Sequence, residues 1–123
     1  MTGDSRFIND GLDHILGSWR GLSSAMVDAY VGDLDHSDPI VSPINGSLAH
    51  FPPVYLITGT RDLLLSDTVR LHRALKRAGA DAELNVYEGQ SHGDYAAALG
   101  TPESLEHYQA LSDFFYRHLV QPH

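Results

Sequence analysis

The middle of this 123-residue chain carries a strand–helix–strand pattern, which limits the folds that the chain can adopt. Residues 54–58 are an apolar run with β-branched residues, bounded by proline and glycine, which is typical of a buried strand. Residues 82–87 form a second such segment. Between them, residues 67–78 are predicted to be helical, with Ser66 as a candidate cap and Gly79 as a stop. Strands connected through a helix predict a parallel pair in an α/β fold.

A carboxylate and an imidazole follow the two strands at equivalent places. Asp62 ends the stretch Thr58-Gly59-Thr60-Arg61-Asp62, and His92 lies in Glu88-Gly89-Gln90-Ser91-His92-Gly93. Open α/β sheets place ligands and catalytic groups at the carboxyl ends of their parallel strands. Either residue alone has an ordinary explanation, as a helix cap or a solvated side chain, but the matched placement favours a catalytic pair. In one kind of Ser…Asp…His triad the acid precedes the base, so we predict Asp62 as the acid and His92 as the base.

The serine of such a triad should come earlier in the chain, in a Gly-x-Ser-x-Gly elbow that follows a strand. We interpret the chain as lacking such an elbow. Gly3-Asp4-Ser5-Arg6-Phe7 resembles its first half, but Phe7 stands where the elbow needs glycine, and no strand precedes it. We therefore interpret Ser5 as an ordinary loop or cap residue. For want of a nucleophile, we expect the chain alone to be inactive.

Helical spacing and turn residues predict the flanking segments. We divide the single domain into a helical segment at residues 1–32, a loop at 33–53, and a strand–helix–strand unit with a C-terminal helix at 54–119. The first segment should form one long helix or two helices that meet near Gly17. Its expected buried stripe is Ile8, Leu12, Ile15, Trp19, Leu22, Met26 and Ala29.

The last helix should begin with Thr101 as its cap. Its expected buried face is Leu105, Tyr108, Leu111, Phe115 and Leu119.

Charge and composition exclude several classes of function. Sixteen acidic and eight basic residues give a net charge of −8, which disfavours binding to nucleic-acid backbones and anionic lipids. The chain has no cysteine, so disulfides and thiolate metal sites are excluded. The stretch at residues 33–38 lacks the glycine and glutamate of a calcium loop, and we expect no metal and no cofactor. No apolar run approaches the ~20 residues of a membrane span, and we expect a cytoplasmic protein.

Two strands are too few for a free-standing α/β domain. A parallel sheet is normally buried on both faces, and open strand edges invite pairing with another chain. We therefore expect this chain to represent the C-terminal third of a larger fold. Its expected partner is a second copy of itself, in a homo-oligomer, or a complementing N-terminal part.

Motifs between about Asp38 and Tyr95 carry a family resemblance. They are Asp38-Pro39-Ile40-Val41-Ser42-Pro43, Phe51-Pro52-Pro53, Leu63-Leu64-Leu65-Ser66-Asp67, Ala78-Gly79, and the two stretches that contain Asp62 and His92. As a set they resemble the hormone-sensitive-lipase-like family of bacterial esterases, α/β-hydrolases that act mostly on short acyl esters. The resemblance implies a partial α/β-hydrolase fold, with Asp62 and His92 as catalytic residues and a small-molecule ester as substrate of the complete enzyme. The family's nucleophile motif and its His-Gly-Gly-Gly oxyanion loop precede the region present here.

Two other functions remain open at this point. The chain could be a non-catalytic assembly or dimerisation module derived from an α/β-hydrolase, which keeps Asp62 and His92 as inheritance. It could also be part of a serine peptidase of the same fold, which uses a similar Asp-then-His layout. The Asp-Pro-Ile-Val-Ser-Pro stretch and the leucine-rich run after Asp62 favour the esterase branch.

Overall fold

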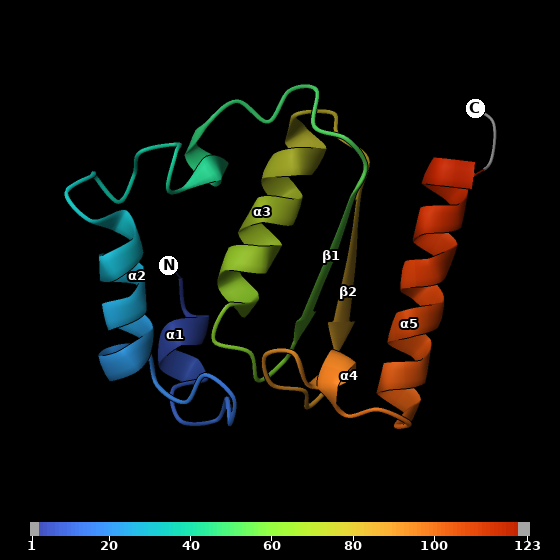
Figure 1. The fold of residues 1–123 in the computed structure, drawn as a ribbon, viewed down its shortest axis with the longest axis horizontal. Coiled ribbons are helices and arrows are strands. Elements are labelled where there is room, and N and C mark those ends of the chain that lie inside the picture. The colour runs from blue at the N-terminus through green and yellow to red at the C-terminus, as the bar shows by residue number, and fades with distance from the viewer. Residues whose placement is uncertain (1–2, 121–123) are drawn as a thin grey trace.

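The two predicted strands are parallel and lie side by side between helices (Figure 1). The structure, a computed structural model, describes residues 3–120. Strand β1 (Val54–Gly59) pairs with β2 (Ala82–Tyr87), and these two strands make up the sheet of the described residues. The register runs from Val54 opposite Ala82 to Gly59 opposite Tyr87, so both strands end at the same edge. This confirms the predicted parallel strand–helix–strand unit.

Helix α3 (Leu65–Arg77) covers one face of the sheet. Its fully buried Leu75 belongs to a hydrophobic core with Leu48 and Ala82. The basic residues of its last turn, Lys76 and Arg77, suit the negative end of the helix dipole. The connection between the strands therefore packs back onto the sheet, as an α/β crossover requires.

The start of α3 differs from the prediction. The helix begins at Leu65 rather than near residue 67, and Ser66 is not its cap. The carboxylate of Asp62 instead accepts the Leu64 N–H at 2.7 Å, immediately ahead of the helix. Ser66 is occupied elsewhere, because its hydroxyl oxygen accepts the Ser5 N–H at 3.0 Å.

Helix α5 (Pro102–Phe115) lies on the other face and continues into a π-helical turn, η3 (Tyr116–Val120) (Figure 1). The Thr101 hydroxyl accepts the Ser104 N–H at 3.2 Å, which confirms the predicted cap. A short helix, α4 (Asp94–Ala97), lies between β2 and α5 in the chain. The sheet is thus sandwiched between α3 and α5.

The face of α5 that meets the sheet is not the predicted one. Ser104, His107 and Phe114 are buried, and the Phe114 ring packs against Tyr55 of β1 with centroids 5.5 Å apart. Four of the five residues predicted to be buried are exposed: Leu105, Tyr108, Phe115 and Leu119. The helix carries apolar residues on two neighbouring stripes, and hydrophobicity alone does not show which stripe faces the sheet.

The N-terminal segment is not the regular helix, or pair of helices, that its spacing predicted. It contains α1 (Ser5–Ile8), a π-helical turn η1 (Trp19–Ser23) and α2 (Ser24–Val31), with turns between α1 and η1. Gly11 and Gly17 have φ angles of 73° and 71°, a left-handed conformation that interrupts a helix. Six of the seven residues of the expected buried stripe are exposed: Ile8, Leu12, Ile15, Leu22, Met26 and Ala29.

Residues 33–53 contain a short 3-10 helix, η2 (Pro43–Asn45), and otherwise turns and irregular chain. Leu48, near the end of this segment, is buried against α3 and the sheet. Among residues 3–120, no helix has the length and apolar character needed to cross a membrane.

Replacing Phe114 by alanine should lower the free energy of unfolding by about 3–5 kcal/mol, because this ring packs against the sheet. The neighbouring Phe115 is 49% exposed, and its replacement by alanine should cost less than about 1 kcal/mol. Chemical denaturation of both variants at one protein concentration measures the two losses. Equal losses would show that α5 presents a different face to the sheet.

Candidate active site

The turns that follow the two strands are held together by backbone hydrogen bonds. We name them the acid turn (residues 59–64) and the histidine turn (residues 88–93). The Thr60 N–H donates to the carbonyl of the last residue of β2 at 3.0 Å, and the Arg61 N–H donates to the Gln90 carbonyl at 3.1 Å. The pairing of the strands therefore continues into the two turns that carry the predicted site residues.

Gly59, the last residue of β1, allows the two turns to approach this closely. A Cβ atom at this position would lie 2.0 Å from the carbonyl oxygen of Gln90 and 2.6 Å from its carbonyl carbon. Both are backbone atoms, which cannot rotate away as a flexible side chain would. Glycine is needed here for space, so that the histidine turn can cross directly over the end of β1.

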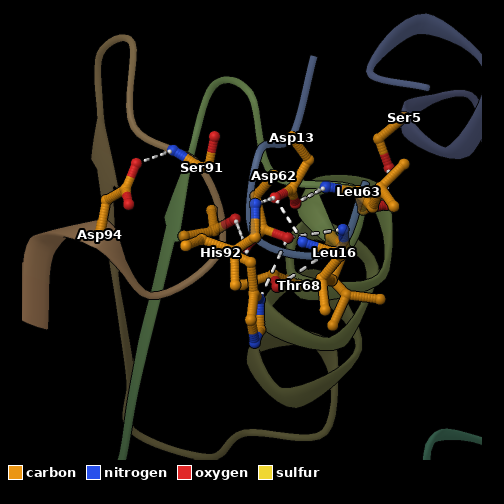
Figure 2. Close-up of polar contacts among 12 residues, drawn as sticks. Ser5, Asp13, Leu16, Asp62, Leu63, Thr68, Ser91, His92 and Asp94 are labelled. Atoms are coloured by element: carbon orange, nitrogen blue, oxygen red, sulfur yellow. Dashed lines mark hydrogen bonds and ion pairs between the residues drawn. The ribbon is translucent and has the colours of Figure 1, made fainter. Parts of the chain in front are cut away.

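Asp62 and His92 contact each other between the two turns (Figure 2). The Nδ1 atom of His92 lies 3.2 Å from both Oδ1 and Oδ2 of Asp62. The structure thus brings the two predicted residues together, while their catalytic role stays a prediction. Because an ionised carboxylate can only accept, Nδ1 carries the proton of a neutral imidazole, and Nε2 is left as the acceptor.

Asp62 is the buried and rigid member of this pair. Its side chain is 2% exposed, Oδ2 accepts the Thr58 hydroxyl at 2.9 Å, and Oδ1 accepts the Leu64 N–H. Burial raises the pKa of Asp62, but the hydrogen bonds from His92, Leu64 and Thr58 outweigh it, so the pKa lies below its ordinary value of 3.8. At neutral pH Asp62 is therefore a fixed negative charge beside the imidazole.

His92 is the accessible member. Its side chain is 39% exposed, and among the described residues nothing bonds to its Nε2 atom. The hydrogen bond with Asp62 raises the pKa of His92 above its ordinary value of 6.5; burial acts in the opposite direction, and the charges of Asp62 and Asp13 raise the pKa further. An imidazole held by a carboxylate on one nitrogen and open on the other is arranged as a general base.

Residues 89–93, Gly-Gln-Ser-His-Gly, match the Gly-x-Ser-x-Gly pattern, so the expectation that the chain lacks this pattern is wrong. Ser91 is fully buried, and its hydroxyl oxygen lies 2.9 Å from Nδ1 of His14 and accepts the His14 N–H at 3.2 Å. A nucleophile elbow instead exposes its serine on a strained turn. His50 is the one non-glycine residue with positive φ among residues 3–120, so Ser91 has no such strain. The geometry therefore does not support Ser91 as a nucleophile.

The N-terminal segment contributes contacts to the site that sequence reasoning missed. Ser5, Asn9 and Asp13 are buried polar residues at a spacing of four, and His14 follows them. The Ser5 hydroxyl donates to the Leu63 carbonyl at 2.7 Å and accepts the Ser66 N–H in the first turn of α3 at 3.0 Å, so Ser5 is a buried helical residue that caps α3 rather than a loop residue. The partners of these residues lie far along the chain, and the regular spacing of polar residues is the one local signal that could have indicated them.

Comparison with known proteins identifies the fold family. A family model described as the alpha/beta hydrolase fold matches residues 5–96, which include both turns of the site and most of the N-terminal segment. The chain belongs to this α/β-hydrolase family. The two-stranded sheet and its helices are therefore part of the α/β-hydrolase fold, as the sequence predicted.

Solved structures similar to this α/β-hydrolase chain confirm the resemblance to hormone-sensitive-lipase-like esterases. The crystal structure of an esterase E25 is 51% identical with a TM-score of 0.93, and the match covers 96% of this chain and 36% of that one. An esterase from the bacterial hormone-sensitive lipase family is 28% identical with a TM-score of 0.84, and the match covers 96% of this chain and 39% of that one.

Curated relatives of this α/β-hydrolase chain have corresponding names. An esterase of Acinetobacter venetianus is 26% identical over 113 residues, which are 92% of this chain and 36% of the relative. A triacylglycerol lipase of Mycobacterium tuberculosis is 32% identical over 79 residues, which are 63% of this chain and 18% of the relative. The chain thus spans about a third or less of the length of these curated relatives.

Replacing Gly59 by alanine should separate Asp62 from His92, because the added Cβ would collide with the backbone of Gln90. We expect a loss of about 1–3 kcal/mol in the free energy of unfolding. The resonances of the His92 imidazole should shift at the same time, which heteronuclear NMR measures. Gly46→Ala is the matched control, since a Cβ there meets a Pro39 side-chain atom at 3.2 Å. Equal effects of the two changes would contradict the close approach.

Proposed function

We propose that this chain supplies the acid and the base of a Ser-His-Asp triad in a carboxylic ester hydrolase. The contact between buried Asp62 and accessible His92 is the observation that carries the proposal. Its position at the carboxyl edge of a parallel sheet agrees with the place where α/β sheets hold catalytic groups. The names of the related proteins, esterase and lipase, support ester hydrolysis over the assembly module and the serine peptidase.

The chemistry follows from the two nitrogens of His92. A serine hydroxyl attacks the ester carbonyl while Nε2 takes its proton, and the imidazolium formed is stabilised by the negative charge of Asp62. The same proton is then given to the departing alcohol, which leaves an acyl-serine ester. In the second half, Nε2 takes a proton from water, the hydroxide attacks the acyl ester, and the proton returns to the serine as the carboxylic acid leaves. Asp62 keeps its charge throughout and fixes the orientation of the ring.

The serine and the oxyanion donors of this reaction are proposed to come from the part of the α/β-hydrolase fold that this chain does not span. Ser5 and Ser66, the other serines near the acid turn, hydrogen-bond to each other and to backbone groups. Neither of them hydrogen-bonds to His92 among the described residues. The chain alone is therefore proposed to be inactive, and complete only when it is combined with the missing part.

Activity measurements test whether the chain supplies the acid and the base while another part of the fold supplies the nucleophile. The chain alone should hydrolyse short p-nitrophenyl esters no faster than its His92→Ala variant. A chimera that joins it to the unmatched residues of esterase E25 should be active and lose on the order of a million-fold with His92→Ala. Asp62→Asn should cost about 10⁴-fold, and His36→Ala, at an exposed histidine, should change little.

The pH dependence of the chimera should follow His92. Because the imidazolium cannot accept a proton, kcat/KM should rise as the pH increases through the pKa of His92, which lies above 6.5. Turnover by the chain alone that disappears in His92→Ala, or a chimera unaffected by His92→Ala, would contradict the proposal.

The exposed apolar surface of the chain indicates that another polypeptide covers it. Both helical flanks expose large apolar side chains, including Leu22 and Met26 on the N-terminal side, Leu105 on α5 and Leu119 on η3. Each of the two strands also has one edge without a partner strand in the described residues. We propose that the remainder of the hydrolase fold covers these surfaces, and that a second copy of the chain does so in its absence.

The mass of the isolated chain in solution tests this covering. We expect a two-fold dimer rather than the 13.5 kDa monomer, since the net charge of −8 opposes indiscriminate aggregation. Adding the complementing part should replace the dimer by a heterodimer, which light scattering detects. A monomer of 13.5 kDa that unfolds in one sharp transition would mean that the chain closes its own core.

A further inference from the structure

Asp13 and His14 contact the two turns of the site separately. The Asp13 carboxylate is fully buried, and its Oδ2 atom accepts the N–H of Leu63, the residue directly after Asp62, at 2.9 Å (Figure 2). Its Oδ1 atom accepts two amides of its own loop at 3.0 Å each. The carboxylate is thus fixed by its own loop and holds the acid turn with its other oxygen.

His14 makes the matching contact with the histidine turn. Its backbone N–H and its Nδ1 atom both lie within hydrogen-bond reach of the Ser91 hydroxyl, at 3.2 and 2.9 Å. Its Nε2 atom lies 3.0 Å from Oδ1 of Asp94, whose Oδ2 atom accepts the Ser91 N–H at 2.9 Å. These contacts form a closed ring around Ser91, which immediately precedes His92.

Resting on the proposed function, we propose that Asp13 and His14 are positioning residues that set the contact between Asp62 and His92. Asp13 fixes the acid turn, His14 fixes the histidine turn, and a single peptide unit joins them. Consecutive Cα atoms are held about 3.8 Å apart, so the two turns cannot drift apart without breaking one set of hydrogen bonds.

Other residues of the N-terminal segment strengthen the hold on the acid turn. The Asn9 side-chain amide donates to the carbonyls of Thr60 and Asp62 at 3.1 and 2.8 Å. The Ser5 hydroxyl donates to the Leu63 carbonyl and accepts the Ser66 N–H at 3.0 Å. Buried backbone groups of the acid turn are therefore satisfied by side chains from a distant part of the chain, which fixes the turn as a unit.

A merely structural role would explain the burial of Asp13 but not its effect on the imidazole. The negative charges that act on His92 are those of Asp62 and Asp13, and both favour the imidazolium. Replacing Asp13 by asparagine removes one of these charges and one of the two accepting oxygens, so either the Leu63 N–H or the two amides of the loop lose their acceptor. A positioning role therefore predicts a change at His92 as well as a change in stability.

The test is an NMR titration of His92 in the 123-residue chain. Asp13→Asn should lower the pKa of His92 and weaken the low-field Nδ1 proton resonance of its hydrogen bond with Asp62. His14→Gln should lower the protection of the amide protons of the histidine turn against exchange, and weaken the same Nδ1 resonance. His14 is 64% exposed, so its replacement is tolerated even if Asp13→Asn unfolds the chain.

Matched controls come from the same chain. Asp10→Asn makes the same charge change three residues earlier, at an exposed carboxylate that bonds within its own loop. His36→Gln removes an exposed histidine that pairs with Asp28 at 3.6 Å, away from both turns. Neither control should change the His92 resonances. If Asp13→Asn and His14→Gln match their controls, the positioning role is refuted.

One further variant separates this outcome from a failure of the proposed function. Asp62→Asn should lower the pKa of His92, because it removes the main partner of the imidazole. If Asp62→Asn has no effect, the catalytic pair itself is wrong, and both proposals fall. If it lowers the pKa while Asp13→Asn and His14→Gln do not, the pair stands and the positioning role fails. In an active chimera, positioning predicts a kcat lowered by up to about 100-fold at unchanged KM.

Discussion

The arrangement of the site depends on how closely the backbone approaches itself where the two strands end. Parallel pairing brings the ends of β1 and β2 to the same edge, and the absence of a side chain at Gly59 lets the histidine turn cross over β1. The contact between Asp62 and His92 follows from this crossing. A side chain at the crossing point would collide with the backbone of Gln90 and push the two turns apart.

Asp62 and His92 differ in burial and in freedom to exchange a proton. Asp62 is buried, accepts several hydrogen bonds and stays charged, so its position and its field are both fixed. His92 is partly exposed, with one nitrogen held and the other open, so it can exchange a proton with an incoming group. A third group that approaches Nε2 would come from the exposed side of the site. This asymmetry agrees with a nucleophile carried by another part of the fold.

The strand–helix–strand unit could be predicted because its signals are local. The strands, the start of α5 at its Thr101 cap and the placement of Asp62 and His92 all follow from residues within a few positions of one another. The spacing of apolar residues did not predict the buried helix faces correctly, because contacts with distant parts of the chain decide which face is buried. Most of the residues that were predicted to form the buried face of the C-terminal helix, and the apolar residues before α2, are exposed, and we propose that other parts of the fold cover them.

The polar residues of the N-terminal segment could not be assigned from the sequence for a different reason. Nothing in the sequence around Asp13 indicates its role, because its partner Leu63 is 50 positions away and only the folded structure brings the two together. The same holds for His14, whose partner Ser91 is 77 positions away. Such pairings follow from the tertiary fold alone, and only the four-residue spacing of Ser5, Asn9 and Asp13 hints at a common buried side.

These long separations also bear on the order in which the molecule assembles and opens. Closing a loop of 50 or more residues is entropically unfavourable until other contacts have shortened it, whereas the crossover between β1 and β2 closes over a shorter stretch. We expect the sheet and α3 to form first and the N-terminal segment to dock last. Transient opening would then release this segment while the sheet stays intact, so the geometry of the site would be the least stable part of an otherwise folded chain. Hydrogen exchange at the Leu63 amide, faster than at the paired amides of β1, would be the sign of this order.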